Sequence, residues 1–593
     1  MILQSLVQYY EILEKRGDVL RPGWCKAKIS FALDISGDGE LLGVIPLKKP
    51  EQRGKKSVEV PQNLDVPEMV PRSSGVLSNF LCDNSSYLLG IDKKGKPERS
   101  LECFEHAKEK HIQILKNVSS DSAAAVRRYF EKWDPGKAGE NPILKPYLDD
   151  ILAGGNLIFS INDVYAQDDE DIQNAWNVYL EESEKGAEGI CLVTGKRMEI
   201  ARIHGTIKGV PGAQSSGAAL VSFNAPAFES FGKEQSFNAP VSTFAVYAYT
   251  TALNYLLADK KHATSIGDTM IVYWSEDGKE ACQNVFAAVS EPTIDNQEIV
   301  DGIFKNLVSG KAINIGEAEE NISMDQRFYI LGLSPNAARI AVRFFYQDSF
   351  GNILKNLQEH YKRMEIVKTA VDGIQYLGIW RMLQETVNKK SRDKKPSANM
   401  AGAVYRAVVS GSRYPDSVYQ AVMGRIRADQ DNKDLHIYKV TRGRTAIIKA
   451  YLLRNKRLEE GEVTVALNEN STNIAYTLGR IFAVLEKIQK DANPEINATI
   501  KDRYFNSASA TPATIFPILF KLKNSHIKKI SSKGKEIYYE TMLGELQDKI
   551  VVEDGSVINA YPRRLSLEEQ GLFVLGYYHQ TQKLYEKKEK EEA

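Results

Sequence analysis

The sequence predicts an α+β N-terminal region with mixed and antiparallel strands and a long glycine-rich loop, followed by an all-helical C-terminal region. Up to about residue 348, extended apolar runs and helical patterns alternate without the strand–helix–strand rhythm of a doubly wound sheet. From Phe350 onward one helical pattern follows another, and between Arg202 and Ser242 neither periodicity persists. Because 593 residues exceed what one core supports, we expect three regions, 1–348, 349–460 and 461–593.

The N-terminal elements follow from apolar spacing. Apolar residues from Leu3 to Leu13 recur at helical intervals and predict an opening helix. Two extended runs, Ala27–Ile35 and Leu41–Leu47, flank a Gly-Asp-Gly turn and predict a hairpin. A strand is expected at Tyr87–Ile91. Helices are expected at 101–117, 120–133, 171–185 and 244–258, and strands at 270–274, 328–333 and 340–345.

The C-terminal part is expected to be helical throughout. Residues 389–396 have the composition of an exposed hinge, and residues 458–470 that of a second boundary. The last region has the length of a small helical bundle. Helices are expected at 350–364, 372–388, 398–409, 415–429, 433–455, 472–490, 539–550 and 565–592.

Composition excludes several classes of protein. Hydrophobic residues make up 43% of the chain and charged residues 26%, as in ordinary globular proteins. The five cysteines are scattered and never form a CxxC pair, which argues against a disulfide framework or a zinc finger. The N-terminus lacks a signal-peptide pattern and no apolar run reaches eighteen residues. We therefore expect a cytoplasmic protein that does not contact a membrane.

The stretch from Arg202 to Ser242 is the first candidate binding element. Glycines punctuate it, and the sequence Ser-Phe-Asn-Ala-Pro occurs twice, at 222–226 and 236–240. So long a loop without regular structure is usually functional or disordered. One interpretation is a surface of backbone amides and short polar side chains that grips a polymer or a phosphate; the other is a long connection held by two Asn-Ala-Pro turns. The candidate residues are Lys208, Gln214, Ser215, Ser216, Asn224, Lys233, Gln235 and Asn238.

A second candidate loop runs from Arg72 to Asn84. Arginine and amide side chains can read base edges, since Arg pairs with guanine and Asn with adenine. The alternative is an ordinary turn that leads into a strand. The candidates here are Arg72, Ser73, Ser74, Asn79 and Asn84.

Positive charge is concentrated in the C-terminal half, although the formal net charge of the chain is zero. Residues 389–457 contain seventeen Lys and Arg against five Asp, and residues 501–535 contain eight against one. Such segments favour a polyanion partner over a simple solvated face. The candidates for backbone contacts are Arg339, Arg425, Arg427, Arg442, Arg444, Lys501, Arg503, Lys521, Lys523, Lys528 and Lys529.

Motifs for catalysis or metal binding are missing. The run Gly212–Gly217 has the internal spacing of a phosphate-binding loop, but Ala218 stands where the lysine is required. A calcium-loop pattern near Asp34 fails because Ile45 occupies the twelfth position. His204 and Cys191 would supply only two zinc ligands. We therefore expect a binding protein that is not an enzyme and has no metal and no cofactor.

Several motifs together resemble a known family. They are Pro22-Gly23-Trp24, the Val70–Gly75 turn leading to Phe80–Asn84, the run Gly209–Asn238 with its doubled Asn-Ala-Pro, and Leu331–Asn336. In these motifs the chain resembles the Csd-type large subunit of the type I-C CRISPR surveillance complex, Cascade, over essentially its whole length.

The resemblance implies a non-catalytic subunit that reads the protospacer-adjacent motif (PAM) in double-stranded DNA, promotes R-loop formation, holds the displaced strand and recruits a helicase-nuclease. The implied partners are CRISPR RNA, target DNA, the foot subunit at the RNA 5′ end, the backbone subunits, and a small subunit made from an internal start. Region 1–348 would then sense the PAM and dock on the complex, and region 461–593 would resemble the small subunit. Two alternatives remain open: a structural scaffold for RNA and protein without DNA readout, and a metal-dependent nuclease.

Overall fold

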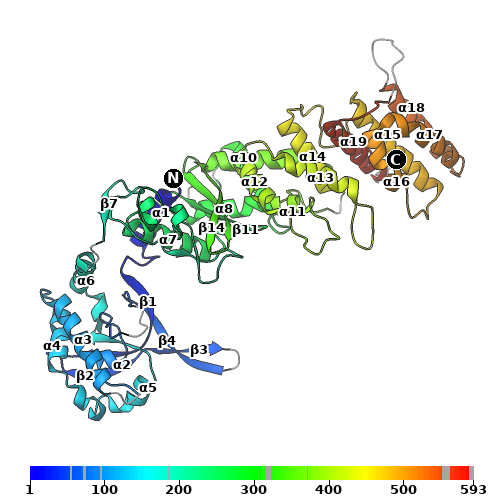
Figure 1. The fold of residues 1–593 in the computed structure, drawn as a ribbon. Coiled ribbons are helices and arrows are strands. Elements are labelled where there is room, and N and C mark those ends of the chain that lie inside the picture. Colours follow the sequence, from blue (N-terminus) through cyan, green and yellow to red (C-terminus); the bar gives the residue numbers. More distant parts are fainter. Residues whose placement is uncertain are drawn as a thin grey trace. The chain divides into compact units, whose positions relative to one another are not determined.

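The computed structural model describes residues 1–53, 56–70, 75–93, 97–183, 186–311, 313, 322–369, 372–550 and 561–586. Apart from the two N-terminal residues, the chain forms two compact units. The first unit contains Leu3–Gly205 and Ser222–Ala252, and the second contains Thr206–Val221 and Leu253–Ala593. The predicted combination of an α+β region and an all-helical region is confirmed (Figure 1).

A six-stranded mixed sheet forms the centre of the first unit. Its strand order is β3-β4-β1-β5-β6, with β2 paired to β1. The predicted hairpin is confirmed as the antiparallel pair β1–β2, whereas β1 and β5 are parallel. The strands are β1 (Trp24–Ile35), β2 (Leu41–Pro46), β3 (Lys48–Arg53), β4 (Lys56–Pro67), β5 (Asn156–Ile161) and β6 (Val164–Tyr165).

Successive side chains of β1 point to opposite faces of the sheet and contribute to two hydrophobic clusters. Phe31, Leu33 and Ile35 pack with residues of the helices, whereas Ala32 belongs to a smaller cluster with Val66. The opening helix is confirmed as α1 (Ile2–Arg16). The other elements of this unit are α3 (Pro97–Leu115), α4 (Asp121–Lys132), α5 (Leu148–Leu152), α6 (Glu170–Ser183), β7 (Glu188–Ile190) and β8 (Arg197–Glu199).

The strand predicted at Tyr87–Ile91 is wrong. Residues Ser85–Leu88 form the short helix α2. The Asn84 side chain accepts a hydrogen bond from the Ser86 N–H at 3.0 Å, which caps the helix. The helical turn buries Tyr87 and Leu88 against the first core, so capping and packing together override the β propensity of the run.

The second unit contains another six-stranded sheet, ordered β11-β12-β13-β14-β10-β9. Its core includes Tyr273 and Phe328 of the sheet, Phe286 of the helix that follows β12, and Phe350 of the helix that follows β14. The strands are β9 (Thr206–Ile207), β10 (Ala218–Ala219), β11 (Ala263–Ile266), β12 (Thr269–Ser275), β13 (Arg327–Asn336) and β14 (Arg339–Ser349). The helices α8 (Glu280–Ser290) and α9 (Gln297–Ser309) were not predicted. The helix expected at 244–258 is confirmed as α7 (Thr243–Ala258), through which the division between the units passes.

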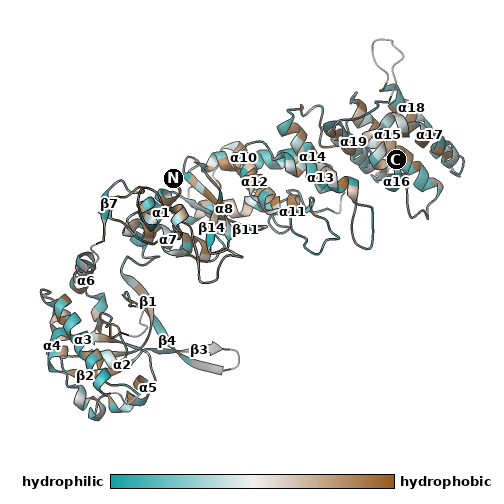
Figure 2. Cartoon of the chain, viewed as in Figure 1, coloured by the Kyte–Doolittle hydropathy of each residue, from teal (hydrophilic) through white to brown (hydrophobic). Residues whose placement is uncertain are grey.

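Helices make up the remainder of the second unit. They are α10 (Phe350–Met364), α11 (Ile379–Gln384), α12 (Ala398–Val409), α13 (Asp416–Ala428), α14 (Arg442–Asn455), α15 (Ile474–Ala492), α16 (Ile500–Ala510), α17 (Pro512–Ile527), α18 (Lys533–Asp548) and α19 (Leu567–Tyr585). In Figure 2 most of them carry both hydrophilic and hydrophobic residues, as helices with one packed face do. Of the residues described, none belongs to a helix long and apolar enough to cross a membrane.

Three details of the helical region were predicted wrongly. The helix expected at 433–455 begins only at Arg442, where the Thr441 hydroxyl caps it by accepting from the Arg444 N–H at 3.1 Å. The helix expected at 372–388 is limited to α11. Helices α16 and α17 were not predicted; α16 begins after Thr499, and α17 begins after Thr511.

Candidate nucleic-acid interface

The glycine-rich stretch forms two separate structures, one in each unit. Residues 206–219, here called the glycine hairpin, belong to the second unit. Residues 229–238, here called the Phe231 turn, belong to the first.

The glycine hairpin extends the sheet of the second unit. Strands β9 and β10 pair antiparallel, and Ala219 of β10 pairs in parallel register with Arg339 of β14. A Cβ at Gly217, whose φ is +111°, would lie 2.5 Å from the Thr206 hydroxyl oxygen. Only glycine therefore allows the two short strands to approach as they do.

Three contacts fix the hairpin. The Lys208 N–H donates to the Asn254 side-chain oxygen at 2.8 Å, and the Asn254 amide donates to the Thr206 carbonyl at 3.1 Å. The Ala219 N–H donates to the Ala338 carbonyl at 3.0 Å. A Cβ at Gly212 would lie 3.3 Å from Pro335, so the hairpin lies against the β13–β14 turn. Two motifs that are far apart in sequence are thus brought together.

The hairpin presents its polar side chains to solvent. Lys208, Gln214, Ser215 and Ser216 are all exposed, whereas Ile207 and Val210 are buried beneath them. Arg339, predicted as a backbone contact, is half-buried on the neighbouring strand. Because the backbone of the hairpin is already fixed, a polar ligand can bind its exposed donors and acceptors with a smaller loss of loop entropy.

The Phe231 turn displays a large aromatic ring. Ser230 and Lys233 form a bridge, and Phe231 and Gly232 between them have φ values of 55° and 67°. Positive φ at both central residues is the pattern of a tight type I′ turn. The Phe231 side chain is 100% exposed. Phe231 was not among the predicted contact residues; the only sequence feature that marks it is the Phe-Gly pair between Ser230 and Lys233.

Asn238 holds this turn in shape. Its side-chain oxygen accepts from the Ser230 N–H at 2.8 Å, and its amide donates to the carbonyls of Lys233 at 2.7 Å and Gln235 at 2.9 Å. The predicted contact residue Asn238 is therefore a structural support, and its counterpart in the first Asn-Ala-Pro unit, Asn224, is exposed. Lys233 is exposed at the end of the turn.

Gln235 is tied to its neighbours as well. Its side-chain oxygen accepts from the Arg202 guanidinium at 2.7 Å, and its N–H donates to Glu229 at 3.2 Å. Gln235 is half-buried, whereas Arg202 is exposed. Hydrogen bonds to Arg202 and Glu229 thus fix the position of Gln235 within the Phe231 turn.

The second predicted loop is divided by what the structure describes. Arg72, Ser73 and Ser74 lie outside the described residues. Asn79 is 1% exposed, and its side-chain oxygen accepts from the Val70 N–H at 2.9 Å. Asn84 caps α2. The side-chain oxygens of Asn79 and Asn84 therefore accept hydrogen bonds from nearby backbone N–H groups.

Many of the predicted basic residues pair with acids that are distant in sequence. Arg444 is 1% exposed and lies 2.6 Å from Asp429, and Lys501 lies 2.7 Å from Asp431. Lys523 binds Glu540 at 2.7 Å. Arg425 and Arg442 also form ion pairs, with Asp429 and Asp372, and Arg427 donates to Gln570. Of the predicted basic residues, those with exposed side chains are Arg427, Arg503, Lys521, Lys528 and Lys529.

His204 and Cys191 have separate hydrogen-bond partners. The His204 Nδ1 lies 2.8 Å from the Tyr249 hydroxyl, and burial lowers the pKa of His204 to about 4. Burial disfavours ionisation of Cys191, but hydrogen bonds from Ser242 and Thr194 lower the pKa of its thiol to about 7. Within the described residues, His, Cys, Asp and Glu side chains form no group that could hold a metal ion.

A family model for a CRISPR-associated protein, Cas_Csd1, matches residues 6–585. The chain belongs to the Csd1 family. The match spans both units, so the glycine hairpin and the Phe231 turn both belong to the family domain. A comparison with curated proteins gives no match.

Proposed function

We propose that this Csd1-family protein is the large subunit of a type I-C CRISPR RNA-guided complex and that it recognises the PAM in double-stranded DNA. The observation that carries the proposal is the Phe231 turn, in which a fully exposed aromatic ring stands on a backbone fixed by Asn238. Aromatic rings stack on bases, and apolar side chains can enter between base pairs and unstack them. A rigid turn delivers such a ring without an ordering cost.

The glycine hairpin is a separate candidate contact surface, in the second unit. Gln214, Ser215 and Ser216 offer donors and acceptors that can meet base edges, and Lys208 offers a phosphate contact. Lys233 serves the same purpose on the Phe231 turn. Sequence specificity beyond the PAM is delegated to pairing with the guide RNA.

The rest of the proposed function is binding. The chain acts in the cytoplasm with CRISPR RNA, the foot and backbone subunits and a small subunit; it promotes R-loop formation and recruits the helicase-nuclease. The exposed Arg503, Lys521, Lys528 and Lys529 contact the backbone of the displaced strand. The chain itself is not an enzyme.

The test is duplex DNA binding by the reconstituted RNA-guided complex, with and without this chain, over a library randomised in the bases that flank the target. We expect a flanking preference only when the chain is present. Equal selectivity without it would make the chain a scaffold, and metal-dependent cleavage by the isolated chain would make it a nuclease.

Two variants connect the preference to the structure. Phe231→Ala should weaken duplex binding by about 1–3 kcal/mol, the value of one base–aromatic stack, while Phe231→Tyr should retain binding. Because the Phe231 ring is fully exposed, neither change should alter the unfolding temperature. Unchanged binding by Phe231→Ala would remove the aromatic contact from the proposal.

A further inference from the structure

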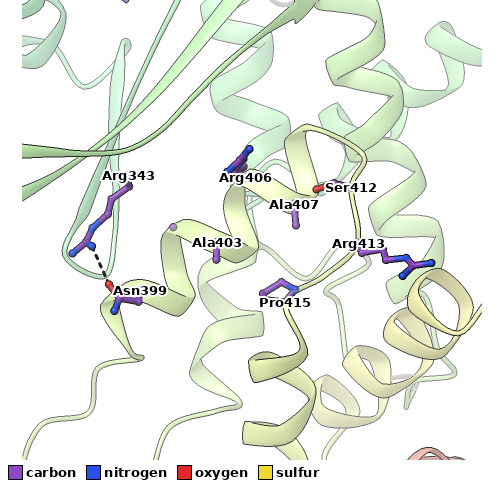
Figure 3. Close-up of a pocket in the computed structure, with 9 residues that line it drawn as sticks. Arg343, Asn399, Ala403, Arg406, Ala407, Ser412, Arg413 and Pro415 are labelled. Atoms are coloured by element: carbon purple, nitrogen blue, oxygen red, sulfur yellow. Dashed lines mark hydrogen bonds between the residues drawn. The ribbon is translucent and has the colours of Figure 1, made fainter.

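A pocket lined by arginines lies in the second unit, and its lining includes no residue of the glycine hairpin or the Phe231 turn. It has a volume of about 420 Å³ and is lined by residues of β14, α12 and the segment between α12 and α13 (Figure 3). Its nine lining residues include three arginines, Arg343, Arg406 and Arg413, and no acid. In the view of Figure 3, Arg406 lies between the other two.

The pocket is built on closely packed elements. A Cβ at Gly402 of α12 would lie 3.6 Å from the Cβ of Arg343, so the helix packs closely against strand β14. The Arg343 guanidinium donates to the Asn399 side-chain oxygen at 2.9 Å, and Asp268 lies 3.8 Å from it. Arg343 is thereby held in place by a weak ion pair and one hydrogen bond.

The other two arginines are not neutralised. Arg406 and Arg413 are exposed, and within the described part of the chain neither guanidinium has a hydrogen-bond or ion-pair partner. A further guanidinium, that of Arg454, donates to the carbonyl of Ala407, a lining residue, at 3.3 Å. The pocket therefore carries uncompensated positive charge.

A second pocket in the same unit provides a contrast. Its volume is about 510 Å³, but its lining includes Asp372 and Glu385. There Arg442 binds Asp372 at 2.9 Å, and Thr441 donates to Glu385 at 2.9 Å. The two acids of this lining balance its two arginines, Arg381 and Arg442, so it has no comparable attraction for an anion.

We propose that the arginine pocket binds the phosphodiester backbone of a single nucleic-acid strand. The planar guanidinium presents paired N–H donors that match phosphate oxygens. Three guanidinium groups from separate segments suit a ligand with successive charges, and a pocket of this size admits a strand but not a duplex. The inference rests on the proposed function, because it takes the protein to work on nucleic acid. Displaced DNA and guide RNA share this chemistry.

The test is site-directed photo-crosslinking in the assembled complex bound to target DNA. Ala403→Cys, at an exposed lining position, carries the photoreactive group; Ser309→Cys, exposed at the end of α9, is the matched control, and the unaltered chain gives the background from native cysteines. We expect strand crosslinks from position 403 above both controls. Separately labelled displaced strand, target strand and RNA identify the source. Crosslinks to protein only, or yields equal to those from position 309, would overturn the proposal.

Charge-neutralising variants test the arginines themselves. The double change Arg406→Gln and Arg413→Gln should lower the crosslink yield and reduce the slope of log K against log salt by about 0.7 for each phosphate that is no longer neutralised. Lys260→Gln, an exposed charge elsewhere in this unit, should leave both unchanged. An unaltered yield in the double variant contradicts the proposal. The flanking-base preference is measured separately, so failure of the pocket and failure of PAM reading give different results.

Discussion

Residues of one type have different roles in this protein, and their surroundings decide which. Arg444 and Arg503 both lie in basic stretches of the sequence. The Arg444 guanidinium is buried, binds Asp429 at 2.6 Å and donates to the carbonyls of Tyr438 and Lys439. Arg503 is exposed on α16. The first charge holds the protein together, and the second is available to a ligand.

Replacing Arg444 should therefore destabilise the protein. Arg444→Met leaves Asp429 buried with only its Arg425 partner, and loss of one member of a buried pair costs about 3–5 kcal/mol. Arg503→Gln, as the matched exposed change, should alter the free energy of unfolding by no more than about 0.5 kcal/mol. Denaturant unfolding of the two variants measures the difference. Equal stabilities would contradict the structural role of Arg444.

His111 gives the first unit a predictable response to acid. Its Nε2 accepts from the Leu81 N–H at 2.8 Å, and its Nδ1 donates to the Ala107 carbonyl at 2.7 Å, so the neutral ring joins α3 to the segment before α2. Burial lowers the pKa of His111 to about 3. Between pH 3 and 6.5 the unfolded chain binds a proton that the folded chain excludes, so stability falls as the pH falls through this window.

The expected loss from His111 is about 2 kcal/mol between pH 7.5 and pH 5. His111→Gln keeps an acceptor for Leu81 but cannot titrate, so its free energy of unfolding should depend less steeply on pH. Urea unfolding at a series of pH values compares the two proteins. Parallel pH profiles would show that His111 does not carry the effect.

At the scale of elements, two glycines allow α15 and α19 to cross in close contact. A Cβ at Gly479 would lie 2.0 Å from the Phe573 carbonyl oxygen, and a Cβ at Gly576 would lie 2.0 Å from that of Tyr476. Both contacts are to backbone, which cannot rotate away. Each helix therefore needs a glycine at the point where it faces the backbone of the other.

Gly479→Ala should separate these helices and lower the stability of the second unit by about 1–3 kcal/mol or more, as overpacking of a close contact does. Gly544→Ala, in α18, is the control, because a Cβ there meets no atom within 4 Å. That change should stabilise the helix by about 0.5–1 kcal/mol. Thermal unfolding followed by circular dichroism measures both; the same sign for the two variants would refute the packing argument.

Elements with a strong apolar period were predictable from sequence, whereas those fixed by side-chain caps were not. Periodicity identified α1, α10 and the β13–β14 pair. The cap at Asn84 turned an expected strand into α2, and the cap at Thr441 shortened an expected helix. The glycine-rich stretch was identified as a candidate site, but the exposure of Phe231 depends on hydrogen bonds from Asn238 that no local pattern encodes.

At the scale of the whole molecule, the sequence gives the total charge of a segment but does not show which charges are paired in the fold. Counting residues in 389–457 gives twelve more positive than negative charges, seventeen minus five, yet several of these cations are paired in the fold. Arg406 and Arg413 contributed to the count but did not stand out until the pocket was visible. Sequence therefore predicts the sign of a partner's charge, and only the fold distinguishes structural cations from exposed ones.

The C-terminal helices share an aromatic cluster of their own within the larger core of the second unit. Phe482, Phe505, Phe573 and Tyr577 from α15, α16 and α19 form a common aromatic core. The links to the preceding helices include polar contacts, such as the hydrogen bond from the Tyr419 hydroxyl to the Leu567 carbonyl at 2.8 Å. A polypeptide that starts near 458–470 retains this core and exposes the face that α13 and α14 otherwise cover.

We predict that such a polypeptide accompanies the full chain as a small subunit. Mass spectrometry of the assembled complex, purified through a tag on another subunit, should find a second species with the same C-terminus and an N-terminus within 458–470. Expressed alone, residues 461–593 should be helical and unfold cooperatively, since the cluster of Phe482, Phe505 and Phe573 lies wholly within them. A complex that contains only the full-length chain would remove the separate subunit, whereas a fragment that fails to fold would show that the bundle needs the α13–α14 face.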